Sequence, residues 1–157
     1  MIKKYFSDLF FVLCVFTLDR ISKILIINLL ENSTNDFIFI TNFLSLNLIW
    51  NEGIAFGLFS FDQKIYYDFL TLIIIFVTII ILWMIVKTRG FEKIAFMMIF
   101  GGSLGNIFDR LFYSSVPDFI DFHIGNFHWF IFNVADIFIT IGVILLIYLE
   151  FLKKKYD

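Results

Sequence analysis

Residues Phe69–Val86 read FLTLIIIFVTIIILWMIV and contain no charged side chain. An α-helix rises 1.5 Å per residue, so about 20 residues are needed to cross a hydrocarbon core of about 30 Å. The whole apolar segment, Ile65–Val86, reaches that length. Of the 157 residues, 61% are hydrophobic and 17% are charged, whereas soluble domains carry roughly 25% charged residues. The sequence therefore predicts an integral membrane protein, and no basic face favours nucleic acid as a partner.

Three further apolar segments reach spanning length only if polar side chains lie inside them. They are about Tyr5–Leu30, Ile94–Phe112 and Phe130–Phe151. The polar residues within them include Asp19, Arg20, Lys23, Asp109, Arg110, Asn133 and Asp136. Each charge at membrane depth costs about 2.5–3.5 kcal/mol on insertion scales, so a purely structural helix would not keep so many. We expect an all-α integral membrane protein with four transmembrane helices, forming one domain over residues 1–157.

The amino-terminal segment has some features of a secretory signal. Lys3 and Lys4 precede the apolar run Phe10–Leu18. A cleaved signal needs small residues at a cleavage site after such a run, but here Asp19–Lys23 follows and the chain then becomes apolar again. We expect a retained first helix.

The basic residues outside the apolar segments predict the orientation. If four spans alternate, one side of the membrane receives Lys3, Lys4, Lys87, Arg89, Lys93 and Lys153–Lys155. The other side receives Lys64 alone between helices. Cytoplasmic loops carry the excess of lysine and arginine. Both termini should therefore be cytoplasmic, and Glu31–Lys64 and Tyr113–Trp129 should be extracytoplasmic.

Part of the first outer segment has the pattern of a strand. Asn42–Leu48 alternates apolar and polar residues after an asparagine turn. Asn51–Gly53 and Gly57 mark further turns. We expect a small extracytoplasmic β element on the membrane surface.

Polar residues from separate segments are predicted to meet at the outer membrane face. They are Asp19 and Lys23 in the first helix, Asn106, Asp109 and Arg110 in the third, Asn133, Asp136 and Thr140 in the fourth, and Asp118 and Asp121 in the outer loop between the last two helices. Residues spaced i, i+3 and i+4 share one face of a helix. If the fourth helix begins at Phe130, Asp136 lies roughly 9–10 Å along it, which is close to the interface and far from the bilayer midplane.

Several of these groups also have simpler explanations. Asp19 with Lys23, or Asp109 with Arg110, could be charges that snorkel from helix ends. Asn133 could cap a helix or form a hydrogen bond between helices. These explanations do not account for the convergence of acids, amides and an arginine at one level of one leaflet.

For other residues we favour the simpler role. We interpret Gly101-Gly102 and Gly105 as close-packing residues, and Asp121 as a solvated loop charge. His123 and His128 are too sparse to predict a metal site, so we expect no metal.

The polar residues fall in five blocks that resemble the signature blocks of the lipoprotein signal peptidase (type II signal peptidase) family. In chain order the blocks are Asp19–Lys23, Asn51–Gly57, Gly101–Arg110, Asp118–Asp121 and Phe132–Asp136. One Gly-Asn-x-x-Asp-Arg match would be weak, but five blocks in the family's order run through all four predicted spans. Three positions depart from the family pattern: Arg20 where glutamine is usual, Ile54 where alanine is usual, and Pro117 where an apolar residue is usual.

The resemblance implies an aspartic endopeptidase that removes the signal peptide from diacylglyceryl-modified prolipoproteins, cutting N-terminal to the lipid-modified cysteine. It implies that Asp118 and Asp136 are the catalytic pair. It places substrate-binding residues at Asp19, Lys23, Asn51, Gly53, Asn106, Asp109, Arg110 and Asn133. It implies no cofactor, and as partners prolipoproteins, membrane lipid and cyclic peptide inhibitors of the globomycin type. The protein would be a monomer in the bacterial cytoplasmic (inner) membrane.

These residue types suit hydrolysis of a peptide bond. Two close carboxylates that share one proton can activate water and protonate the leaving nitrogen, because like charges raise one pKa. Asn133 could fix the pair or donate to the scissile backbone. Arg110 stays charged, and its planar fork suits a substrate carbonyl or the Asp109 carboxylate.

Two other classes of protein share part of this pattern. A proton-coupled transporter also needs intramembrane carboxylates, but usually near the midplane, in interrupted helices of repeated halves. A non-enzymatic scaffold would explain the glycines and aromatic residues but not the acid pair. Cleavage of a lipid-modified precursor by the purified protein distinguishes the three classes.

Overall fold

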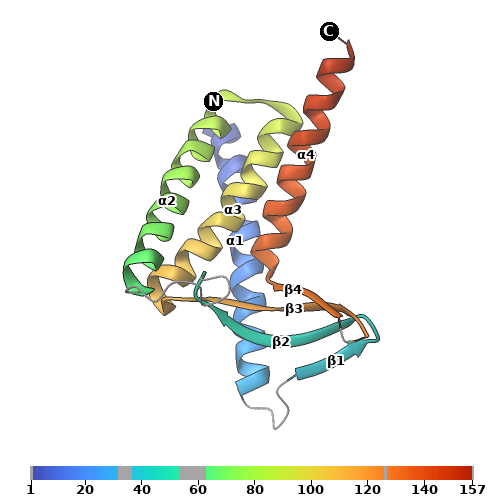
Figure 1. Cartoon of the computed structure of the whole chain (residues 1–157). Coiled ribbons are helices and arrows are strands. Elements are labelled where there is room, and N and C mark those ends of the chain that lie inside the picture. The colour runs from blue at the N-terminus through green and yellow to red at the C-terminus, as the bar shows by residue number, and fades with distance from the viewer. Residues whose placement is uncertain (1, 32–36, 54–62, 126, 157) are drawn as a thin grey trace.

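The computed structural model describes residues 2–31, 37–53, 63–125 and 127–156. Within them the chain forms α1 (Ile2–Glu31), β1 (Phe37–Thr41), β2 (Leu44–Asn51), α2 (Gln63–Lys87), α3 (Gly90–Tyr113), β3 (Val116–Ile124), β4 (Phe127–Phe132) and α4 (Val134–Tyr156). The protein is mostly helical and carries a small antiparallel sheet (Figure 1). Positions Ile54 and Gly57, which the sequence analysis singled out, lie outside the described residues.

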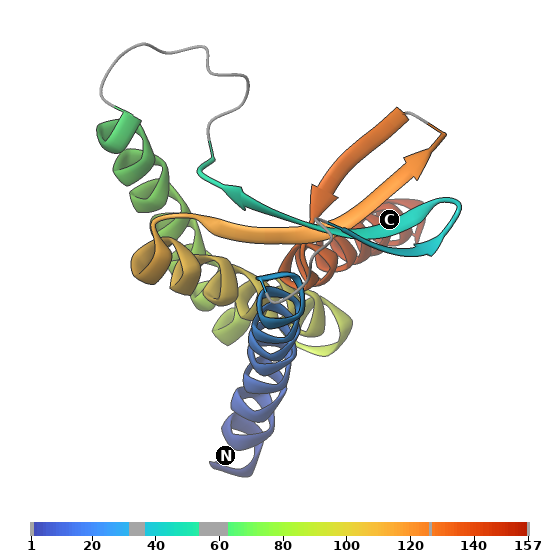
Figure 2. The same cartoon turned by 90° about the horizontal axis from the view of Figure 1, so that it is seen from below.

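Helix α3 packs against each of the other three helices. Consecutive helices alternate in direction, so that α1 and α3 end, and α2 and α4 begin, at the end of the bundle that carries the sheet (Figure 1). Seen from that end, the strands cross beneath the helices (Figure 2). Helices α1 and α3 contact the strands there.

Three helical segments in the described part of the chain are long and apolar enough to cross a membrane: Lys64–Lys87, Gly90–Tyr113 and Val134–Lys154. They leave large apolar side chains exposed, such as Leu72 and Phe76 at 64% and 65%, as a lipid-facing surface would. Helix α1 has 30 residues, which is long enough, but charged residues interrupt its apolar run. The fold supports three of the four predicted spans, and the first stays a proposal.

Helix α4 begins later than predicted. Phe130–Phe132, which the sequence analysis placed in the helix, belongs to β4. The physical reason is that Phe127–Phe132 reads FHWFIF, whose aromatic and β-branched residues favour a strand, and it pairs with β3. Asp136 lies in the first turn of α4, so the predicted distance of roughly 9–10 Å along the helix was wrong.

Three glycines let α3 approach its neighbours closely, which confirms their predicted packing role. A Cβ on Gly101 would lie 2.8 Å from Val15 of α1, and one on Gly102 would lie 2.6 Å from the carbonyl oxygen of Ala135. A Cβ on Gly105 would lie 2.4 Å from Asp19 Oδ2. No real Cβ tolerates such distances, so the α3 backbone can reach these contacts only with glycine.

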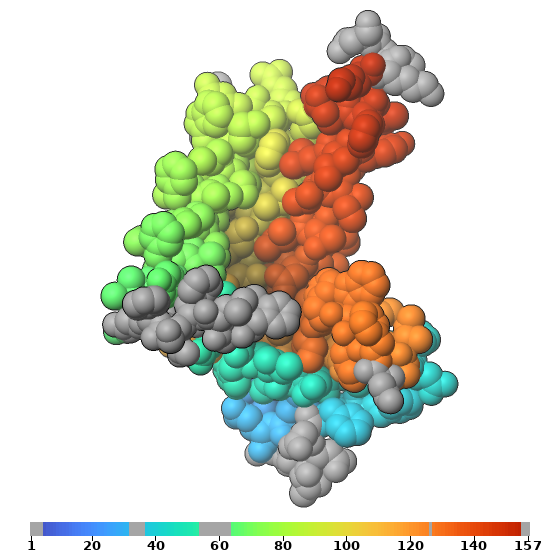
Figure 3. All heavy atoms as spheres, in the orientation of Figure 1, coloured from blue at the N-terminus to red at the C-terminus, as the bar shows by residue number. Residues whose placement is uncertain are grey.

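The sheet has the order β1-β2-β3-β4 with antiparallel neighbours. It packs on α1 through Ile26 and Leu30, which contact Phe119 of β3. In the space-filling view the strands lie at that end of the bundle, below α4 (Figure 3). The strand predicted after the Asn42 turn is confirmed as β2, but β3 and β4 were not predicted. Asp118 and Asp121 lie on β3, so their assignment to a loop was wrong.

Candidate active site

Two carboxylates and two cations form a buried cluster between α1 and α3. Asp19, Lys23 and Asp109 are at most 1% exposed. Lys23 Nζ donates to Asp19 Oδ2 at 3.0 Å, to Asn106 Oδ1 at 2.9 Å and to Asp109 Oδ2 at 2.6 Å, which uses all three ammonium protons. Arg20 pairs with both carboxylates, at 3.1 Å to Asp19 and 2.6 Å to Asp109. The four formal charges cancel, which lowers the cost of burying them.

The cluster also contacts α4. Asp19 Oδ1 accepts the backbone N–H of Ala135 at 3.0 Å. Asn106 accepts from Lys23 through its carbonyl oxygen and donates through Nδ2 to Asp136 Oδ1 at 2.9 Å. The lysine fixes which way the Asn106 amide points, so the ion cluster determines the donor that Asp136 receives.

Asn133 joins Asp118 to Asp136. Its Nδ2 donates to Asp118 Oδ1 at 2.6 Å, and its backbone N–H donates to Asp136 Oδ2 at 3.1 Å. The Asp136 N–H donates back to Asn133 Oδ1 at 3.1 Å. This reciprocal pair is a capping box at the start of α4. The residue that caps the helix therefore also holds the two carboxylates side by side.

Strand β2 contacts the other oxygen of Asp118. Asn51 Nδ2 donates to Asp118 Oδ2 at 2.8 Å, while Asn51 Oδ1 accepts the Gly53 N–H at 2.7 Å. Gly53 has φ +74°, a left-handed conformation that favours glycine. The turn after β2 thus orients the Asn51 amide toward the carboxyl group.

Burial raises the pKa of Asp118 to about 6, because desolvation disfavours the charged form. The donors on Asn51 and Asn133 act in the opposite direction, and the nearby Asp136 carboxylate raises the pKa further. A carboxyl group with this pKa can hold a proton at a pH where an ordinary aspartate has lost it. Two adjacent carboxyl groups in different protonation states can serve as acid and base.

Arg110 presents unpaired donors beside this site. Its Nε and NH1 are buried and have no hydrogen-bond partner among the described residues. The guanidinium lies over the Tyr67 ring, 5.3 Å from its centre, and a Cβ on Gly53 would be 3.1 Å from NH1. Asp109, which the sequence offered as a partner for Arg110, pairs with Lys23 and Arg20. Arg110 thus has guanidinium donors beside Gly53 that no described residue accepts from.

Asp121 is buried, so its interpretation as a solvated loop charge was wrong. It is 1% exposed. The physical reason is strand pairing: Asp121 faces Ser45 across β2 and β3, and Ser45 Oγ donates to Asp121 Oδ2 at 3.2 Å. His128 Nδ1 lies 2.8 Å from the same oxygen.

The structure brings most of the predicted site residues into one hydrogen-bonded network. Its members are Asp19, Lys23, Asn51, Gly53, Asn106, Asp109, Asp118, Asn133 and Asp136. Arg110 borders the network at Gly53, whereas Thr140 is exposed on α4. Arg20 was named among the polar residues of the first span but not among the predicted site residues, although its position beside Asp19 was a signal. The Asp121–His128 pair was not predicted.

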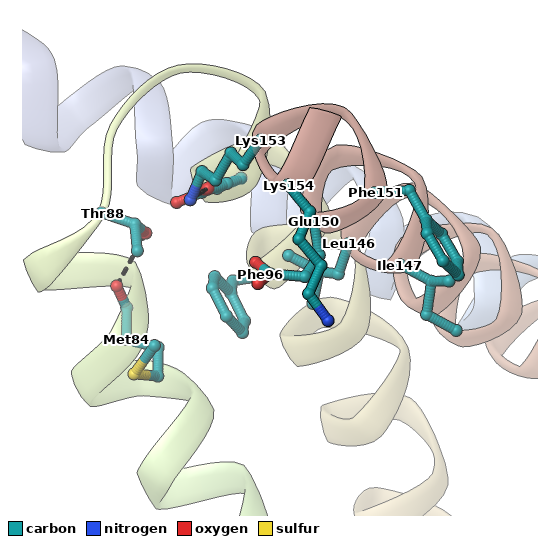
Figure 4. Close-up of a pocket in the computed structure, with 10 residues that line it drawn as sticks. Met84, Thr88, Phe96, Leu146, Ile147, Glu150, Phe151, Lys153 and Lys154 are labelled. Atoms are coloured by element: carbon teal, nitrogen blue, oxygen red, sulfur yellow. Dashed lines mark hydrogen bonds and ion pairs between the residues drawn. The ribbon is translucent and has the colours of Figure 1, made fainter. Parts of the chain in front are cut away.

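A cavity of about 600 Å³ lies at the other end of the bundle, where α2, α3 and α4 meet (Figure 4). Met84, Phe96 and Leu146 line it, together with charged residues such as Glu92 and Lys153. None of the residues of the hydrogen-bonded network lines this cavity. We therefore assign the candidate active site to the hydrogen-bonded network at the sheet end of the bundle and not to this cavity.

The fold and the polar site define a helical membrane enzyme whose reactive groups lie at one end of its helices. A solved structure described as a bacterial membrane enzyme, at 2.3 Å resolution, matches with a TM-score of 0.68 and 29% identity, over 95% of this chain and 89% of that chain. The chain belongs to the signal peptidase (SPase) II family, whose profile matches residues 11–152. Membership in this family identifies it as a protease.

Relatives named lipoprotein signal peptidase agree with this assignment. The protein from Pelagibacter ubique is 49% identical over 156 residues, which cover 98% of this chain and 94% of the relative. The protein from Francisella tularensis subsp. novicida is 44% identical over 120 residues, which cover 74% of each chain. The family resemblance stated from the five sequence blocks is confirmed.

Proposed function

We propose that the chain is an aspartic endopeptidase that removes the signal peptide from diacylglyceryl-modified prolipoproteins, cutting N-terminal to the lipid-modified cysteine. The observation that carries the proposal is that one residue, Asn133, donates hydrogen bonds to both Asp118 and Asp136. The name of the relatives supports prolipoproteins as the substrate class.

The proposed reaction uses the two carboxyl groups as one acid–base pair. The ionised carboxylate takes a proton from water while the water oxygen attacks the scissile carbonyl carbon. The protonated carboxyl donates to the carbonyl oxygen, and a proton then passes to the leaving nitrogen as the C–N bond breaks. We assign the roles of acid and base to the pair and not to either carboxyl group alone.

The other site residues divide into two groups. Asp19, Lys23 and Asp109 are too buried to touch a peptide, so we infer that they act as positioning residues through Asn106. Arg110 has two donor atoms without a partner among the described residues, and we infer that they bind a substrate carbonyl. Asn51 and Gly53 border the dyad from the strand side, where a bound peptide would lie.

We also infer four spans with both termini cytoplasmic, in the bacterial inner membrane. Helix α1 runs beside α3 (Figure 1), and its charges are neutralised by Asp109 and by each other. The basic residues Lys87, Arg89 and Lys93 lie at or near the helix ends opposite the sheet, which suits a cytoplasmic face.

The test is cleavage of matched precursors, with and without the diacylglyceryl group, by the purified protein in one detergent. Asp118→Asn and Asp136→Asn should each slow cleavage by about 10²–10⁴-fold, because asparagine cannot exchange a proton. Asp68→Asn, at an exposed position on α2, is the matched control and should cleave normally. Near-normal cleavage by either dyad variant would contradict the aspartic mechanism.

The lipid arm tests the substrate class separately. Each buried methylene contributes about 0.8 kcal/mol of anchoring, so the diacylglyceryl group should hold the scissile bond at the level of Asp136, in the first turn of α4. The unmodified precursor should therefore be cleaved poorly. Equal rates for the two precursors would refute the lipid requirement and leave the dyad chemistry standing.

A further inference from the structure

A second cluster of chemically reactive side chains lies on the sheet, around the β3–β4 hairpin. His123 and His128 face each other across the hairpin, and their rings stack with centres 5.1 Å apart. Asp121 Oδ2 is 2.8 Å from His128 Nδ1 and 4.0 Å from His123 Nδ1. One potential ligand atom from each of the three residues lies within 4.8 Å of the other two.

The Asp121 carboxylate is buried and oriented by a hydrogen bond, as carboxylates that bind metals usually are. Asp121 is 1% exposed, and Ser45 Oγ donates to its Oδ2 at 3.2 Å. Hydrogen bonds of this kind orient ligating carboxylates. Because the donor belongs to β2, three strands contribute to the cluster.

The hydrogen bond between Asp121 and His128 leaves the ring nitrogen of His123 unexplained. His123 Nδ1 is buried and has no hydrogen-bond partner among the described residues, although it points toward the Asp121 carboxylate. Buried polar atoms are normally satisfied. A cation bound by all three residues would satisfy this nitrogen.

The donor set selects the kind of cation. Two imidazole nitrogens and one carboxylate oxygen suit Zn²⁺, which takes bonds of about 2.0–2.2 Å in tetrahedral geometry. The ligand atoms of such a site are about 3.3 Å apart. That value lies between the 2.8 Å and 4.0 Å separations seen here. A pocket of about 270 Å³, lined also by Asn47 and Gly125, leaves room for water as the fourth ligand.

We propose that Asp121, His123 and His128 form a Zn²⁺ site that ties the β3–β4 hairpin together. Through Ser45 the site also tethers β2. Strand β3 carries Asp118 and strand β2 carries Asn51. The bound ion would therefore stiffen the sheet that supports the dyad. The role of the ion is structural, and the reaction proposed above does not pass through it.

The experiment uses the full chain, purified in detergent with a tag that contains no histidine and stripped of metal with a chelator. Titration with Zn²⁺ should show one binding site and raise the melting temperature, and Co²⁺ should give the visible absorption of a tetrahedral complex. The chain has two histidines and one cysteine, so little else in it can mimic such a site.

Variants assign the signal to the cluster. The double variant His123→Asn, His128→Asn should lose the Co²⁺ absorption, and Asp121→Asn should weaken Zn²⁺ binding by about 100-fold or more. Glu52→Gln, which removes an exposed carboxylate just beyond the end of β2 opposite to Ser45, should bind Zn²⁺ normally. Ser45→Ala keeps all three ligands and should weaken binding by about tenfold, which keeps the test valid if a ligand variant fails to fold.

Two results would overturn the proposal. One is equal Zn²⁺ binding by the native protein and the double histidine variant. The other is no rise in melting temperature and no Co²⁺ absorption for the native protein, which would leave a hydrogen-bonded Asp121–His128 pair. Neither result bears on cleavage by the dyad, because the readouts measure metal binding.

Discussion

Replacing Asp118 with asparagine should change how the stability of the protein depends on pH. Asp118 is 4% exposed, and its pKa is raised from 3.8 to about 6. The folded state therefore holds this proton more tightly than the unfolded state does. The resulting stabilisation is fully present below the unfolded pKa and is lost as the pH rises through the folded pKa.

The two pKa values set the size of the effect. Between pH 4 and pH 7 they imply a loss of about 2–3 kcal/mol in the free energy of unfolding. For a chain of this length, that loss corresponds to about 5–10 °C in melting temperature. Asparagine has no proton to exchange, so this part of the pH dependence should vanish in Asp118→Asn.

The assay is thermal melting of both proteins in one detergent between pH 4 and pH 7. Taking the difference between the two melting curves at each pH removes the groups that they share. The melting temperature of the variant, relative to the native protein, should rise by about 5–10 °C across the range. Asp68→Asn, on the exposed side of α2, should show no such trend. Parallel pH curves for the native protein and Asp118→Asn would refute the reasoning.

Three further predictions follow from the buried contacts and the proposed orientation. Lys23→Met removes one of the two cations that Asp19 and Asp109 share, leaves an excess of one buried negative charge, and should destabilise the protein by about 3–5 kcal/mol, measured by thermal melting against the exposed control Lys64→Met. Gly105→Ala places a Cβ 2.4 Å from Asp19 Oδ2 and should cost about 1–3 kcal/mol; an unchanged melting temperature would show that α1 and α3 can separate freely. A topology reporter inserted at Arg89 should read cytoplasmic and one at Gly125 extracytoplasmic, and the reverse result would place the dyad on the wrong side for the proposed substrate.

The sequence was informative where one physical constraint dominates. The uncharged run Phe69–Val86 has no alternative to a bilayer, and α2 (Gln63–Lys87) includes it. The convergence of polar residues on one end of the bundle was also predictable, because helix periodicity and alternating spans place them there. The network found around Asn106 and Asn133 agrees with that expectation.

The sequence was less informative where strand pairing decides. The segment Val116–Phe132 is apolar and aromatic, so its hairpin is hard to distinguish from a loop joined to a helix. Asp121 becomes buried only because β2 brings Ser45 to it, a contact between residues far apart in sequence. The start of α4 had a local signal: Asn133 was a possible helix cap and has the spacing of a capping box with Asp136, yet the helix was predicted to begin at Phe130.

The ion cluster between α1 and α3 has a consequence for how the protein enters the membrane. Helix α1 carries Asp19, Arg20 and Lys23, and so has an excess of one positive charge at this level until Asp109 of α3 pairs with its cations. Until that pairing forms, α1 is a poor membrane segment, since unpaired charges at bilayer depth are costly. Its stable insertion should therefore wait for the synthesis of α3, nearly ninety residues later. The same charges that position the dyad would make membrane insertion a cooperative event between two distant parts of the chain.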